Sequence, residues 1–262
     1  IFKNEDTKEA LKKLSGGATG PLNIHLRQEI ERLNRVVVVV AETLRMLRLA
    51  IAGSIAMSDD VLASLEAVYA GRPPAAWLKI SWESPTLGLW FQGLLNRHDQ
   101  LHSWLNSGRP KSFWFHGFFN PQGFLTAVKQ EVTRKHAADG WALDDVVMIS
   151  AVTRMVDAAA VREGPSEGVY IHGLFLEGCS WDAKDGGKLV DAQHKKLFSP
   201  LPVLHVTAVQ ARDKKKTGFF EAPCYKGRRR TGQTYVCNVM LSTQESRTKW
   251  ILRGAALLSS ID

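Results

Sequence analysis

The chain has 262 residues, of which 45% are hydrophobic, and its 34 basic and 26 acidic residues give a formal net charge of +8. This length is sufficient to bury one large core or two modest ones, and the composition excludes an intrinsically disordered protein. The charge suggests an acidic protein surface, a nucleic acid or a membrane face as partner. It is concentrated between Arg212 and Arg230, a span with eight basic and two acidic residues.

The cysteines indicate a reducing, intracellular environment. Cys179, Cys224 and Cys237 are too few and too widely spaced for a zinc ribbon, and their odd number argues against a disulfide framework. No secretory signal is expected, and because the chain begins with Ile1 we expect a piece of a longer protein. The apolar run 36–40 is soon followed by charged residues, so no transmembrane segment is expected.

The first half of the chain has helical periodicity. A charged leader, 1–20, ends in a glycine-rich loop that lacks the Lys and the Ser or Thr of a phosphate-binding loop. Pro21 then begins a predicted helix that extends to residue 52, with apolar residues at steps of three and four. At 1.5 Å per residue this helix would be roughly 48 Å long.

Two interpretations of this helix remain open. It could be a core helix of a bundle, or a strut that lies across a larger assembly. In the second case its apolar stripe would dock on the assembly. The candidate docking residues are Leu26, Ile30, Leu33, Val37, Val40 and Leu44.

Two more helices are predicted before residue 110. Ser58 is a good N-cap for a helix over 59–69, and a second helix should extend from about Pro85 to residue 108. His98 and His102 are four residues apart on the second helix, a spacing that can bind a metal, but without a third ligand nearby solvated or core-edge histidines are favoured. Four tryptophans are interpreted as core residues: Trp77, Trp82, Trp90 and Trp104.

An aromatic segment, 113–127, marks the transition between two sequence patterns. Its aromatic side chains must lie in or beside a core because they carry large apolar areas. Asn120 followed by Pro121 predicts an N-cap and a helix that extends to about His136. After this helix the hydrophobic period changes to two.

The second half is predicted to form a small antiparallel β-barrel or sandwich. The fold is therefore α+β, with a helical subdomain over 21–140 followed by a small antiparallel barrel over 141–262. The predicted strands are 146–152, two pieces within 168–178, 203–209, 219–225, 235–241 and 250–258.

The residues favour a non-catalytic module. Glu177, Asp182 and Asp185, with His172 nearby, could imitate a catalytic or calcium-binding cluster, but a turn rich in Asp and Gly explains the same residues without chemistry and is the favoured interpretation. The sequence lacks a nucleophile elbow, a metalloprotease helix and a dinucleotide-binding fingerprint. No metal and no cofactor are predicted.

Two basic loops, 212–216 and 226–230, allow a second interpretation. They could meet on one barrel face and bind a polyanion such as a nucleic acid or an acidic tubulin tail. Alternatively they are solvated hairpin tips that blunt the sheet edges, which is the favoured interpretation. The candidate residues of this basic surface are Lys214, Lys215, Lys216, Arg228, Arg229 and Arg230.

Four segments resemble the C-terminal region of dynein heavy chains, the part that follows the last AAA+ module. They occur in the family's order, cover nearly the whole sequence and lie at 21–30, 113–130, 168–178 and 250–258. The third segment and the Trp181-Asp182 pair after it are closer to axonemal than to cytoplasmic dyneins. The sequence departs from the family pattern at 219–230.

The resemblance implies a helical part and a β-barrel that lie against one face of the AAA+ ring, with the long helix crossing module boundaries. It implies a non-catalytic regulatory and bracing role in a microtubule motor. ATP and Mg would bind in the ring, and microtubules at the stalk tip, so this segment would hold no cofactor. The expected partners are the ring of the same heavy chain and other dynein subunits, not a membrane or a nucleic acid, in a ciliary or flagellar axoneme of the cytoskeleton.

Overall fold

The chain folds as two units, described by a computed structural model for residues 2–214 and 217–261. One unit holds the residues up to 19 together with 23–108 and is helical. The other holds residues 20–22 and those from 109 onward, and it contains the described strands. The predicted α+β class, with helices before strands, is confirmed.

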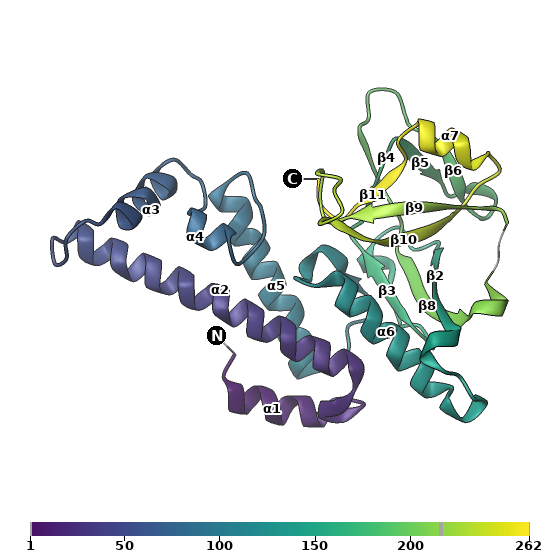
Figure 1. Cartoon of the computed structure of the whole chain (residues 1–262), viewed down its shortest axis with the longest axis horizontal. Coiled ribbons are helices and arrows are strands. Elements are labelled where there is room, and N and C mark those ends of the chain that lie inside the picture. Colours follow the sequence, from purple (N-terminus) through teal and green to yellow (C-terminus); the bar gives the residue numbers. More distant parts are fainter. Residues whose placement is uncertain (1, 215–216, 262) are drawn as a thin grey trace. The chain divides into compact units, whose positions relative to one another are not determined.

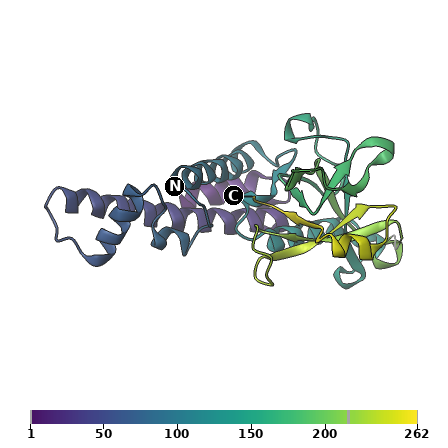
Figure 2. The same cartoon turned by 90° about the horizontal axis from the view of Figure 1, so that it is seen from above.

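The helical unit is built around one long helix. Its helices are α1 (Asn4–Lys13), α2 (Pro21–Ile51), α3 (Asp59–Tyr69), α4 (Ala75–Leu78) and α5 (Leu87–Ser107). α2 and α3 agree with the predicted helices. Figures 1 and 2 show α1 beside the first part of α2, and α3 beside its last part. None of the described helices combines the length and the apolar content that crossing a lipid bilayer requires.

Short polar side chains set the starts of two helices. The Ser58 hydroxyl accepts a hydrogen bond from the backbone N–H three residues later, at 3.4 Å, and so caps α3. Thr86 caps α5 in the same way at 3.2 Å. Because a capping residue lies just outside the helix, α5 begins at Leu87, slightly later than predicted.

Tryptophans form much of the helical unit's core, as predicted. Trp77, Trp90 and Trp104 are buried. The ring centroids of Trp77 and Trp90 are 4.9 Å apart, and Trp82 stacks on Trp90 at 5.1 Å. The indole N–H of Trp77 also donates to the hydroxyl of Thr43 on α2, at 3.1 Å, which fixes α4 against the long helix.

The second unit packs helices against two sheets. Its elements are β1 (Phe113–Trp114), α6 (Pro121–Lys135), β2 (Val146–Val152), β3 (Val169–His172), β4 (Phe175–Glu177), β5 (Cys179–Asp182), β6 (Lys188–Asp191), β7 (Phe198–Pro200), β8 (Leu204–Gln210), β9 (Phe219–Tyr225), β10 (Tyr235–Ser242), α7 (Arg247–Leu252) and β11 (Ala256–Leu258). One sheet has the order β1-β3-β8-β2 and the other β10-β9-β11-β4-β7, while β5 and β6 form a separate pair. Figure 1 shows α6 alongside β2 and β8.

The aromatic segment lies in the core of this unit, as predicted. Phe113, Phe115, Phe118 and Phe124 are buried, and the rings of Phe118 and Phe124 stack with centroids 4.4 Å apart. The Asn120 side chain caps α6 by accepting a backbone N–H at 3.1 Å.

The prediction of a small antiparallel barrel is wrong. The strands form open sheets with mixed pairing, because β1 runs parallel to β3 and β9 runs parallel to β11. Parallel neighbours need a long crossover connection. α6 and β2 lie between β1 and β3 in the sequence, and β10 and α7 lie between β9 and β11. The regular turn spacing of the sequence did not reveal these crossovers.

The predicted strand over 250–258 is wrong in its first part. This stretch contains the end of α7, and only its last residues form β11. The Ser246 hydroxyl accepts the Lys249 N–H at 3.3 Å and starts the helix, and Gly254, with a φ of +64°, follows its end. A capped start and a left-handed glycine favour one helical turn in place of a strand.

The division between the units lies earlier than the predicted boundary at 140. The helical unit ends at Gly108, and α6 belongs with the sheets. α6 packs on β8, β2 and β10, because one of its faces carries the buried residues Phe124, Val128 and Val132. The leader 1–20 is likewise largely part of the helical unit, since α1 packs on α5.

Gly178 should be intolerant of a side chain. Its φ is +73°, and an added Cβ would lie 2.4 Å from the carbonyl oxygen of Arg253. We expect Gly178→Ala to lower the free energy of unfolding by more than the roughly 1–3 kcal/mol of backbone strain alone, measured by urea denaturation. Gly140, with a φ of +75° and nothing within 4 Å of its added Cβ, is the matched control. Equal losses of stability in Gly178→Ala and Gly140→Ala would show that the contact between the added Cβ and the Arg253 carbonyl oxygen has no effect.

Candidate interaction surfaces

The residues predicted for docking on the long helix do not share one environment. Leu26, Ile30, Leu33 and Val40 are buried, and Val37 is half-buried. Leu44 is exposed, at 39%. Side chains buried by this chain itself are not available to another surface, so most of the predicted stripe serves the chain's own packing.

A groove opens instead on a different side of α2. It has a volume of about 900 Å³ and is formed by α2, α3, α4 and the loop that follows α3. Val38 and Met46 line it from α2, and Val61 and Ala63 from α3. Val38 is 55% exposed although it is fully apolar. We call this feature the α2–α3 groove.

Charged side chains surround the apolar lining of the α2–α3 groove. Glu42, Asp60, Arg72 and Lys79 contribute to its walls. Glu42 is held by Arg45, whose guanidinium donates to both carboxylate oxygens at 2.9 and 2.7 Å. An apolar centre with a polar edge is the usual anatomy of a protein–protein interface.

A buried charge cluster joins α2 to α5. Glu29 is fully buried and lies 3.9 Å from both His25 and Arg32. Arg97 of α5 is also buried; it interacts electrostatically with Glu29 and lies 3.8 Å above the Trp82 ring. Burial lowers the pKa of Arg97 to about 9, an effect that Glu29 partly offsets. This cluster stabilises the helix pair and was not predicted from the sequence.

His25 makes the stability of the chain sensitive to acid. Burial, together with the charge of Arg32, lowers the pKa of His25 from 6.5 to about 4. The unfolded chain therefore binds a proton at a higher pH than the folded chain, and stability is lost as the pH falls from about 6.5 to about 4.

We expect the protonation of this histidine alone to make the free energy of unfolding about 2 kcal/mol lower at pH 5 than at pH 7. Urea unfolding of the wild type and of His25→Gln at both pH values measures it. The variant should lose less stability on acidification, and equal losses in the two proteins would contradict the assignment.

The basic loops are largely engaged with their own unit. Lys214 donates to Glu221 at 2.6 Å, and Arg230 pairs with Glu177 and donates to the carbonyl of residue 254 at 2.8 Å. The guanidinium of Arg228 lies over the Phe198 ring, 5.2 Å from its centroid. Arg229 is exposed, whereas Lys215 and Lys216 lie outside the described residues.

The two histidines considered for metal binding pack against each other. The rings of His98 and His102 stack at 5.5 Å, and Phe2 lies 5.2 Å from His98. His98 also contacts Asp99, at 3.2 Å. Within residues 2–214 and 217–261, no group of three or more His, Cys, Asp or Glu side chains could hold a metal ion.

The carboxylates considered for catalysis or calcium binding have separate partners. Glu177 pairs with Arg230, and Asp182 accepts the Lys184 backbone N–H at 3.0 Å. His172 contacts the Ser112 hydroxyl at 3.0 Å, and burial lowers its pKa. Asp185 lies in the turn after β5, as the turn interpretation predicted.

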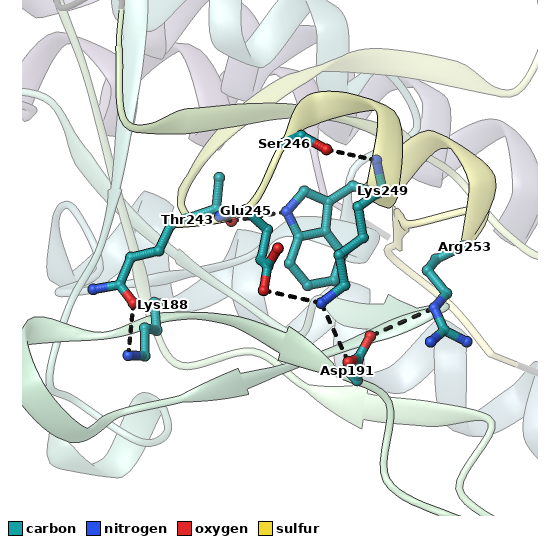
Figure 3. Close-up of polar contacts among 9 residues, drawn as sticks. Lys188, Asp191, Thr243, Glu245, Ser246, Lys249 and Arg253 are labelled. Atoms are coloured by element: carbon teal, nitrogen blue, oxygen red, sulfur yellow. Dashed lines mark hydrogen bonds and ion pairs between the residues drawn. The ribbon is translucent and has the colours of Figure 1, made fainter.

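A second charged cluster, around Asp191 of β6, holds α7 against the β5–β6 strand pair (Figure 3). Asp191 forms ion pairs with Lys249 at 3.3 Å and with Arg253 at 3.5 Å, and Lys249 forms a second ion pair with Glu245 at 3.2 Å. The buried Trp250 donates its indole N–H to Thr243 at 2.8 Å. These contacts position α7, and a serine N-cap shortly before a tryptophan is the sequence signal that could have predicted this helix.

The comparisons with known proteins agree with the resemblance found in the sequence. The family profile for the C-terminal domain of dynein heavy chains matches residues 2–259. The protein is 53% identical, over its full length, to the dynein gamma chain of the flagellar outer arm of Chlamydomonas reinhardtii. It is 45% identical over 98% of its length to each of the mouse (Mus musculus) axonemal dynein heavy chains 8 and 5.

The chain spans only 5–6% of the length of these relatives. Their axonemal and flagellar names agree with the expected axonemal type and with the expected cytoskeletal location in a cilium or flagellum. The family profile covers both units of the chain and nearly all of its residues. The chain therefore belongs to the family of C-terminal domains of dynein heavy chains.

Proposed function

We propose that this chain is a non-catalytic regulatory and bracing domain that packs on the AAA+ ring of its own heavy chain. The observation that carries the proposal is the α2–α3 groove, an apolar surface of the helical unit left open by the chain's own packing. The chain spans 6% of the length of its gamma-chain relative, so the remaining 94% of such a heavy chain is available as a neighbour. A ring module from that remainder would occupy the groove. The domain would need no cofactor, and ATP and Mg would bind in the ring.

The composition of the groove supports this occupant. Val38 is exposed, and half-buried Val39 and Met46 line the same groove, so this side of α2 offers apolar area. Covering this area releases ordered water and stabilises a complex at roughly 25 cal/mol per Å² before the costs of association. The mixed charges at its edge favour a protein surface over a lipid or a polyanion.

Hydrogen–deuterium exchange tests the proposal directly. The heavy-chain motor that contains this domain and the isolated chain are compared, and peptides of α2 after residue 36 and of α3 are followed. We expect slower exchange of these peptides in the motor, with little change in the peptides around exposed Leu95 of α5. Equal exchange of the groove peptides in both samples would show that the ring does not cover the groove.

The polyanion interpretation stays a prediction without added support. Lys214 and Arg230 are already paired with carboxylates, and a paired cation contributes less to the binding of an external anion. We expect dynein subunits and the ring to be the partners of this domain, in the axoneme of a cilium or flagellum, with microtubules bound elsewhere in the heavy chain.

A further inference from the structure

Two of the three cysteines lie opposite each other on neighbouring strands. Cys224 of β9 and Cys237 of β10 face each other in the strand register, directly after a β-bulge between Tyr235 and Cys237. Opposite residues of antiparallel strands have Cα atoms about 4.5–5.5 Å apart, and a disulfide needs roughly 4.4–6.8 Å. The pair can therefore be bridged with little movement of the backbone.

The two thiols differ in access. Cys224 is buried, whereas Cys237 is partly exposed and lines a cavity of about 250 Å³. The cavity is formed by residues of α6, β2, β8 and β10 around the aromatic core. Cys237 is the partly exposed thiol of the pair, so an external disulfide meets it before the buried Cys224, whose pKa is raised by its contact with Cys237 and by burial.

The third cysteine is a suitable internal control. Cys179 of β5 is buried, and its thiol donates to the Glu177 carbonyl at 3.7 Å. Burial raises the pKa of Cys179 to about 12, and the residue opposite it on the neighbouring strand is Asp191, so no thiol faces it across the strand pair.

We propose that Cys224 and Cys237 form a reversible redox site, which an external disulfide oxidises by thiol–disulfide exchange. The Cys237 thiolate attacks the external disulfide, forms a mixed disulfide and releases one thiol. The Cys224 thiol then gives up its proton, attacks the Cys237 sulfur and releases the second thiol. Two protein thiols are oxidised, one external disulfide is reduced, and the two protons end on the two released thiols.

The bridge would act on the β9–β10 hairpin. The segment between the two cysteines contains the basic loop 226–230, which reaches Glu177 of β4 through Arg230. A covalent link between the hairpin strands would restrict this loop. In a reducing compartment such a bond serves regulation rather than permanent stabilisation.

The test uses the heavy chain that contains this domain, equilibrated in buffers with decreasing ratios of reduced to oxidised glutathione. Free thiols are then alkylated, and peptides are mapped by mass spectrometry with and without reduction. Trypsin separates the two cysteines at the basic loop, so a disulfide joins two distinct peptides. We expect a Cys224–Cys237 cross-linked peptide in the wild type and in Cys179→Ser, and its loss on reduction.

Single variants separate this result from other oxidation. In Cys224→Ser, Cys237 has no partner thiol and should be trapped as a mixed disulfide with glutathione. Cys237→Ser removes the other thiol, and because Cys237 is partly exposed, this change should not disturb the core. In Cys237→Ser, Cys224 should remain a free thiol in every buffer. The proposal is overturned if the wild type gives only glutathionylated Cys237, or if both cysteines stay fully alkylated in the most oxidising buffer.

Discussion

Replacing Arg97 with alanine is expected to lower the free energy of unfolding by about 3–5 kcal/mol. Glu29 is fully buried, and removal of the guanidinium would leave its carboxylate without its cationic partner from α5. The variant also loses the stacking on Trp82 and the hydrogen bond to the Gly93 carbonyl, at 3.1 Å. Urea denaturation of the chain measures the loss.

The double variant Glu29→Ala/Arg97→Ala distinguishes the interaction between the two charges from the loss of packing that each substitution causes. If the two charges stabilise each other, the double variant should lose less stability than the sum of the single variants. Glu42→Ala, which breaks the exposed pair with Arg45 on the same helix, should change the stability little. Additive losses at Glu29 and Arg97 would contradict a coupled pair.

The second large effect is expected at the α2–α3 groove. Val38→Asp combined with Ala63→Asp places a carboxylate on each of its two apolar walls. Both positions are exposed in the chain, so folding should be unaffected. A ring module that covers the groove would have to bury two unpaired charges, and we expect binding to the motor to weaken at least about 100-fold, by the cost of burying unpaired charge.

Leu95→Asp is the matched control for this variant. Leu95 of α5 is 55% exposed, like Val38, and does not line the groove. Binding is measured between the purified chain and the same motor truncated before this domain, with circular dichroism to confirm that each variant is folded. Equal weakening by Leu95→Asp, or unchanged binding of the groove variant, would count against docking through the groove.

Local signals in the sequence predicted the longer helices well, whereas the short helices α4 and α7 were not predicted. Ser58 and Asn120 mark helix starts with their own side chains, and the apolar steps of α2 continue through the whole helix. These features depend on residues within a few positions of each other. A single sequence therefore carries enough information to place them.

Features that join distant residues were missed. The parallel pairing of β9 with β11 depends on a crossover through α7. His25 and Glu29 are four residues apart and could have suggested a pair, but nothing local indicates that Arg97 completes their cluster. Likewise, an apolar stripe on a helix does not reveal which of its residues the same chain already covers, and so Leu33 was predicted to dock although it is buried.

A salt series tests whether the domain docks on the ring through apolar contact. The purified chain is bound to the motor truncated before this domain, from low salt to well above physiological ionic strength. Charge pairs at the surface are screened over about 10 Å at 0.1 M salt, whereas apolar burial is not. We predict tight binding that persists at high salt, and binding that disappears at moderate salt would contradict apolar docking and favour the basic loops as the contact surface.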